Sequence, residues 1–99
     1  MKVKWTHQAR RDLAAIHDYI AADSPFYAAQ VVNTILETEH EIAAQPLAGS
    51  MIRERARRDI RQVKRYSWRI IYRIKARTID VLTIVHSKRD LKSEQEAGN

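Results

Sequence analysis

The sequence predicts an α+β fold in which a helical hairpin packs on one face of a small, mainly antiparallel sheet, in the order β-αα-βββ. Two amphipathic helical patterns follow one another with a two-residue break between them. Strand-like patterns of apolar residues then fill the segment 60–90. A chain of 99 residues has the length of one domain, so we expect a single domain over 1–99 with a frayed polar tail at about 92–99.

The composition is that of a globular chain whose charge is unevenly distributed. Residues 53–90 carry thirteen Lys and Arg against four Asp and Glu, whereas the whole chain has a net charge of +6. This excess indicates an acidic partner, either nucleic acid or an acidic protein segment; the alternative is a solvated sheet face that only maintains solubility. The sequence has no cysteine and no apolar run long enough for a signal peptide or a membrane span. We therefore expect a cytoplasmic protein with no membrane partner.

The first half of the chain predicts a strand and two helices. Alternation around Val3 predicts a short strand, and Thr6 is suited to cap a helix over 7–23. Ser24-Pro25 then combines a capping residue with a proline at the first position of a second helix, over 25–44. The inner face of the second helix is expected to carry apolar residues at helical spacing, namely Ala28, Val32, Ile35, Leu36, Ile42 and Ala43, with Val31 beside them.

The second half predicts the centre of the sheet. Residues 68–74 alternate as a strand does, and residues 79–86 are apolar at odd and even positions alike, which is typical of a strand buried on both faces. The short connection 75–78 makes the two strands an antiparallel hairpin. We expect the helices to cover the face that carries Trp68, Ile70, Tyr72 and Ile74. Strict alternation then places Ile71, Leu82 and Ile84 on the opposite face, where either they are exposed or a partner covers them.

Nearly the whole chain resembles the RelE/ParE superfamily of toxins from bacterial type II toxin–antitoxin pairs, and its ParE branch in particular. The resemblance rests on VKWTHQARRDLAAIHDYIA, SPFYAAQVVNTI, the turn from Pro46 to Gly49 and IRQV…WRIIYRI…IDVLTIVHSKRD. It implies a toxin that poisons DNA gyrase, blocks replication and is neutralised by a ParD-like or related antitoxin. The alternative, implied by the RelE branch, is a ribosome-dependent mRNA endonuclease. A third hypothesis is an inactive toxin retained as an antitoxin-binding partner.

The chemistry of RNA cleavage separates the two branches. It requires groups that remove and deliver protons, and positive charge on the phosphate in the transition state. The resemblance places Arg69 and Arg89 at two arginine positions of the RelE nucleases, but Gln62 stands at a lysine position and Gln95 near the position of a C-terminal tyrosine. His86 is the remaining candidate base; its alternative is a strand-end histidine bonded to the backbone. We therefore expect binding without catalysis, with Arg69, His86 and Arg89 as the nuclease residues under the alternative.

Two binding surfaces follow from the same segment. We expect the target to contact cationic and polar residues near the end of the sheet, namely Arg61, Arg69, His86, Lys88 and Arg89. We expect an amphipathic acidic helix of the antitoxin to cover the apolar face opposite the helices, contacting Ile71, Leu82, Ile84 and Arg73. His7 and His17 have no second ligand at a suitable spacing, so we expect neither a metal nor any other cofactor.

Overall fold

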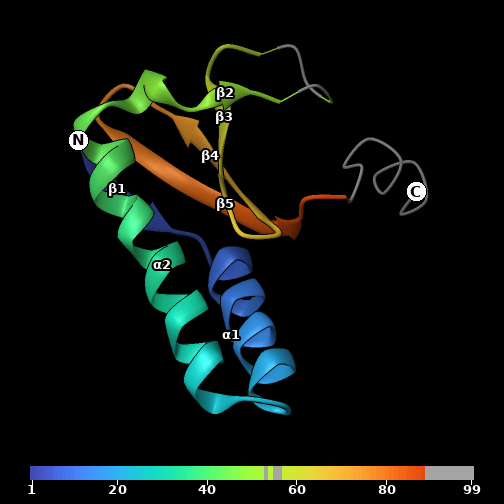
Figure 1. The fold of residues 1–99 in the computed structure, drawn as a ribbon. Helices are drawn as coiled ribbons and strands as arrows, with labels where there is room; N and C mark the ends of the chain where they lie inside the picture. The colour runs from blue at the N-terminus through green and yellow to red at the C-terminus, as the bar shows by residue number, and fades with distance from the viewer. Residues whose placement is uncertain (53, 55–56, 89–99) are drawn as a thin grey trace.

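The computed structural model describes residues 1–52, 54 and 57–88, and these residues form a sheet with a helical hairpin on one of its faces (Figure 1). The elements are, in chain order, β1 (Lys2–Trp5), α1 (His7–Ala21), α2 (Pro25–Ala44), the 3-10 turn η1 (Pro46–Ala48), β2 (Ser50–Met51), β3 (Ile60–Arg65), β4 (Trp68–Ile74) and β5 (Thr78–His86). The predicted α+β class is confirmed, with β2 as one strand more than predicted. The expected tail at 92–99 lies outside the described residues. No helix of the described part is long and apolar enough to cross a membrane.

The five strands lie in the order β1-β5-β4-β3-β2. β5 lies between β1 and β4, in agreement with its uninterrupted apolar sequence. β4 and β5 form the predicted antiparallel hairpin, while β1 pairs with β5 in parallel, with Lys2 opposite Thr78. β1 is therefore an edge strand of the sheet, and its neighbour is β5.

Both helices begin at the predicted capping residues. The Thr6 hydroxyl accepts a hydrogen bond from the backbone N–H of Ala9 at 3.1 Å and lies 2.8 Å from the carbonyl oxygen of Val81, to which it donates. Thr6 thus ends β1, starts α1 and ties both to β5. Ser24 accepts from the backbone N–H of Tyr27 at 3.1 Å, with Pro25 in the first turn.

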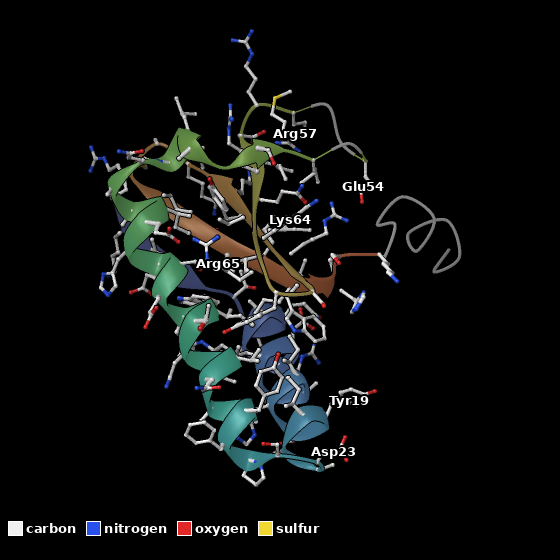
Figure 2. The ribbon with its side chains drawn as sticks, in the orientation of Figure 1. Tyr19, Asp23, Glu54, Arg57, Lys64 and Arg65 are labelled. Atoms are coloured by element: carbon white, nitrogen blue, oxygen red, sulfur yellow. The ribbon has the colours of Figure 1, made fainter. Side chains whose placement is uncertain are left out.

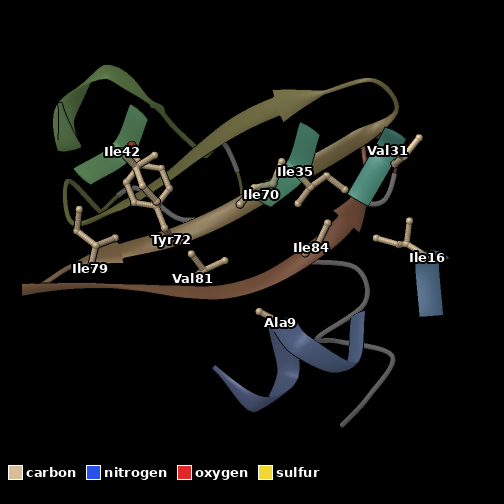
Figure 3. Close-up of a cluster of buried hydrophobic side chains, with 10 residues drawn as sticks. All are labelled: Ala9, Ile16, Val31, Ile35, Ile42, Ile70, Tyr72, Ile79, Val81 and Ile84. Atoms are coloured by element: carbon tan, nitrogen blue, oxygen red, sulfur yellow. The ribbon is translucent and has the colours of Figure 1, made fainter. Parts of the chain in front are cut away.

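The main core lies between the helices and the sheet (Figure 3). α2 contributes a stripe spaced by three or four residues, namely Ala28, Val31, Ile35, Thr38 and Ile42. The prediction for Leu36 is wrong, because Leu36 is exposed, whereas Val31, predicted to lie beside the stripe, is fully buried. Thr38 is tolerated there because its hydroxyl donates to the carbonyl of Ile35 at 2.6 Å.

A β-bulge in β5 changes which face the last residues of that strand occupy. Ile71 lies opposite Thr83, but the next residue, Tyr72, lies opposite Val81, so Leu82 is an extra residue in β5. Beyond the bulge the alternation is reversed. The prediction that Ile84 lies on the face away from the helices is therefore wrong: Ile84 is buried beneath them, opposite Ile70.

Asp12 of α1 holds this bulge from the helical side. Its Oδ2 accepts a hydrogen bond from the backbone N–H of Ile84 at 3.0 Å and another from the hydroxyl of Thr83. Its Oδ1 accepts from the side-chain amide of Gln8 at 2.7 Å. The carboxylate thus bonds donors from both α1 and β5.

Tyr72, predicted to lie in the core, joins the centre of the sheet to the turn before β2. Its hydroxyl donates to the carbonyl of Pro46 at 2.7 Å and accepts from the N–H of Gly49 at 3.2 Å. A Cβ at Gly49 would collide with this hydroxyl and would lie 2.8 Å from the carbonyl oxygen of Gln62. Burial raises the pKa of Tyr72 above its usual value of 10.0.

Candidate functional site

The sheet face away from the helices, called the outer face below, carries a small apolar cluster of its own. This outer cluster consists of Ile52, Ile60, Ile71 and Val85, with Leu82 packed against it. Ile71 is only 2% exposed. The expectation of an exposed apolar patch around Ile71 is therefore wrong, because Ile52 and Ile60 pack with it. Leu82, which is half-buried, stays on this face as predicted, and Val85 takes the place predicted for Ile84.

Arg69 extends from β4 on the outer face and is almost completely buried, with 5% of its surface exposed. Its guanidinium donates two parallel hydrogen bonds to the Glu54 carboxylate, at 2.8 and 2.9 Å. Its Nε donates to the side-chain oxygen of Gln62 at 2.6 Å. A buried guanidinium needs partners of this kind, because an unpaired charge away from water is costly. Arg69 is thus committed to an internal ion pair.

Glu54 is the site residue that the sequence analysis missed. It lies on the segment that follows β2, where Figure 2 labels it. The only signal in the sequence is its position as a single acidic residue within an arginine-rich run, from Arg53 to Arg58. That signal does not identify Arg69 as its partner, because the two are fifteen residues apart in the chain.

Arg61, predicted to contact the target, lies on the face of the sheet that the helices cover and bonds backbone carbonyls there. It lies opposite Tyr72 in the register, and Tyr72 faces the helices. Its Nη1 donates to the carbonyls of Gly49 at 2.9 Å and Leu47 at 3.3 Å, and its Nε to that of Arg58 at 3.1 Å. The bonds to Gly49 and Leu47 fix the turn before β2, and the bond to Arg58 holds the segment before β3.

Arg73, expected to border the antitoxin surface, shares one carboxylate with Arg57. Asp59 lies 3.1 Å from Arg73 Nε and 2.7 Å from Arg57 Nη2. The hydrogen bond from Arg57, with smaller contributions that include one from Arg73, holds the pKa of the Asp59 carboxyl below its usual value of 3.8. The three residues form an exposed charge network at the end of β4.

His86 and Lys88 lie where β5 ends. The Nδ1 atom of His86 accepts a hydrogen bond from the backbone N–H of Lys88 at 3.2 Å, and its ring meets the Trp68 ring edge to face, with centroids 5.4 Å apart. His86 is thus bonded to the backbone at the end of a strand, as expected under the alternative to a catalytic base. Lys88 is exposed, and Arg89 lies outside the described residues.

A pocket of about 400 Å³ opens beside His86, between α1 and the ends of β4 and β5. Its lining is formed by Asp12, Ala15, Ile16, Tyr19, Trp68, Ile84, Val85 and His86. Tyr19, near the C-terminal end of α1, is 79% exposed and projects into solvent (Figure 2). The pocket thus has an apolar wall, aromatic side chains and one carboxylate.

Exposed aromatic residues continue along the turn between β3 and β4. Tyr66, in this two-residue turn, has a positive φ of 54° and is 59% exposed. Its ring meets that of Tyr27, at the start of α2, edge to face, with centroids 6.3 Å apart. A bulky residue at positive φ is strained, and such strain is concentrated at functional sites. This turn is therefore a candidate contact surface.

The described residues contain no group of three or more His, Asp and Glu side chains that could hold a metal ion. Neither the outer face nor the pocket presents an aligned set of acid, base and phosphate-binding groups among the residues described above. The structure thus brings together Arg69, Gln62 and Glu54 on one face, and His86, Trp68 and Tyr19 at the end of the sheet.

Comparisons with known proteins identify the relatives of this chain. Residues 3–91 match the family described as the ParE toxin of the type II toxin–antitoxin system parDE. The chain is similar to a structure of the chromosomal ParDE toxin–antitoxin system from P. aeruginosa, with a TM-score of 0.72 and 27% identity over 89% of this chain and 97% of that one. It is also similar to a structure of the toxin–antitoxin complex RelBE2 from Mycobacterium tuberculosis, with a TM-score of 0.62 and 25% identity over 86% and 95% of the two chains. A search of curated protein sequences found no match.

Proposed function

Since the chain belongs to the ParE toxin family of type II toxin–antitoxin systems, we propose that it poisons DNA gyrase in the cytoplasm and blocks replication by binding, without a reaction of its own. Its fold and its family make it the toxin of a pair. Both similar structures are of toxin–antitoxin systems, which supports an antitoxin as its partner. The choice of gyrase rests on the likeness to the ParE branch.

The observation that carries the non-catalytic part of the proposal is the Arg69–Glu54 ion pair. A nuclease of the RelE type needs positive charge placed against the phosphate in the transition state. Arg69 is buried, and its charge is neutralised by a bidentate carboxylate. The neighbouring strand position holds Gln62, whose side-chain oxygen accepts from Arg69 and which carries no charge. Two positive charges that a RelE-type nuclease would use here are therefore missing: the charge of Arg69 is neutralised, and Gln62 has none.

The remaining predicted target contacts lie at the end of the sheet. We propose that Lys88, which lies beside His86, meets the acidic surface of the target together with Arg89, the next residue in the sequence. Exposed Lys64 on the outer face would add to the same positive field. Arg61 and Arg69 then act by shaping the surface, because their guanidinium groups are bonded within the chain.

We propose that the antitoxin docks on the outer face, over Leu82 and Arg73. An acidic amphipathic segment would bury its apolar stripe on Leu82 and place a carboxylate near Arg57 and Arg73, in competition with Asp59. Ile71 would lie in the buried cluster against which Leu82 packs. Direct contact with Ile71 would require the segment around Ile52 to move.

Two assays on the purified chain test the proposal. We expect it to stabilise the cleaved-DNA complex of gyrase in a supercoiling assay, and to leave mRNA intact on programmed ribosomes. Cleavage of ribosome-bound mRNA that is lost in the His86→Ala variant would contradict the proposal and establish the nuclease function. A folded chain that is inactive in both assays but still binds its antitoxin would also contradict it, and would identify an inactive toxin retained as a partner.

A further inference from the structure

We propose that the pocket between α1 and the ends of β4 and β5 receives an arginine side chain presented by a partner protein. The pocket is lined on the helical side by residues spaced three or four apart on one face of α1: Asp12, Ala15, Ile16 and Tyr19. Its volume of about 400 Å³ is within the range of small-ligand sites. The pocket adjoins the proposed gyrase contacts at His86 and the outer cluster at Val85, but its α1 wall belongs to neither surface.

Charge complementarity indicates a cation. In a chain with a net charge of +6, Asp12 is the only carboxylate among the described residues that line the pocket, and no Lys or Arg is among them. An ionised carboxylate has about four lone-pair positions. Gln8, Thr83 and Ile84 donate to three of them, so one position remains for a donor from a partner.

The rest of the lining favours arginine over lysine. Tyr19, Trp68 and His86 contribute aromatic rings to the lining. A planar guanidinium stacks on aromatic faces more readily than an ammonium group does. The aliphatic stem of an arginine would pack on Ile16 and Ile84.

The surroundings indicate that the arginine belongs to a polypeptide. Tyr19 is exposed at the rim of the pocket, and the turn that leads to Trp68 carries the exposed, strained Tyr66 and its contact with Tyr27. Tyr and Trp are enriched at protein interfaces, and such a surface offers apolar contacts to residues that flank the arginine.

The binding test uses the full chain and three probes, followed by NMR through the assigned indole N–H resonance of Trp68. We expect N-acetyl-arginine amide to shift this resonance saturably. The matched neutral probe, N-acetyl-citrulline amide, should bind about fivefold more weakly or worse, because it lacks the charge. The peptide acetyl-Leu-Arg-Leu amide should bind several-fold more tightly than the arginine amide, because its leucines contact the aromatic rim. These measurements need neither gyrase nor antitoxin, so their failure is distinct from a failure of the proposed toxin function.

Variants locate the site. Tyr19→Ala should weaken the binding of the arginine amide by about two- to fivefold, and its fold should be intact because Tyr19 is exposed. Asp12→Asn should weaken binding by about tenfold. The control Leu36→Ala, at an exposed position of α2 outside the pocket, should leave the binding of the arginine amide unchanged. Equal binding of the arginine and citrulline probes, or unchanged binding in a folded Tyr19→Ala variant, would overturn the proposal. Equal binding of the peptide and the amide would overturn the assignment to a polypeptide.

Discussion

Replacement of Glu54 by Gln should destabilise the fold, because it removes the negative charge that accepts two hydrogen bonds from the buried guanidinium of Arg69. The Arg69 and Glu54 side chains are 7% and 11% exposed. Removing one member of a buried ion pair costs about 3–5 kcal/mol. Gln62 still accepts one hydrogen bond from the guanidinium in the variant, so we expect the lower end of that range, about 3 kcal/mol.

Urea unfolding monitored by circular dichroism measures this loss. The matched control is Arg57→Gln, which breaks an exposed ion pair with Asp59 and should change the free energy of unfolding by about 1 kcal/mol or less. The double variant Glu54→Gln, Arg69→Met removes both charges, and we expect it to regain most of the stability that the single variant loses.

A loss of less than about 1 kcal/mol in the Glu54→Gln variant would refute this reasoning, because it would mean that the pair is solvated in solution. It would also remove the main argument against phosphate binding by Arg69. A double variant as unstable as the single one would show that the loss comes from packing and not from breaking the ion pair.

Three further predictions concern other parts of the chain. Gly49→Ala should lower the free energy of unfolding by about 1–3 kcal/mol in denaturant titrations, because its Cβ collides with the Tyr72 hydroxyl, and the added change Tyr72→Phe should restore part of it. Stability should be fully present below pH 10.0 and decline as the pH rises through the raised pKa of Tyr72; this decline should be smaller in the Tyr72→Phe variant, as measured by melting temperatures across that range. Lys88→Gln should weaken growth inhibition with a change of less than about 0.5 kcal/mol in stability, and unchanged toxicity in the folded variant would exclude Lys88 as a target contact.

The parts of this fold that the sequence predicts are those that depend on near neighbours. Thr6 and Ser24-Pro25 predict where the two helices begin. They do so because a capping side chain and the fixed φ of proline act on the backbone within one helical turn. The β4–β5 hairpin follows from alternation and a short connection.

The features that could not be predicted depend on contacts between distant residues. The bulge at Leu82, which reverses the face of Ile84, is held by Asp12, which lies seventy-two residues before Ile84 in the chain. The pairing of Arg69 with Glu54 likewise requires the register of the sheet. Nothing in the sequence indicates that ion pair, so the sequence predicts target binding for Arg69, whose charge is in fact buried.

The parallel pairing of β1 with β5 has a consequence for synthesis of the protein. β1 leaves the ribosome well before its pairing partners in β5, residues 78–81, because about seventy residues separate the two strands in the chain. Thr6 and Asp12 also form hydrogen bonds with β5. These contacts join residues that are far apart in the sequence, and such contacts raise the contact order and slow folding. A nascent or truncated chain that stops before β5 therefore lacks Ile79, Val81 and Ile84 from its core. It also lacks the contacts of α1 with β5. We expect the native fold to form only after β5 has been translated, so that translation products that stop before β5 should lack toxicity.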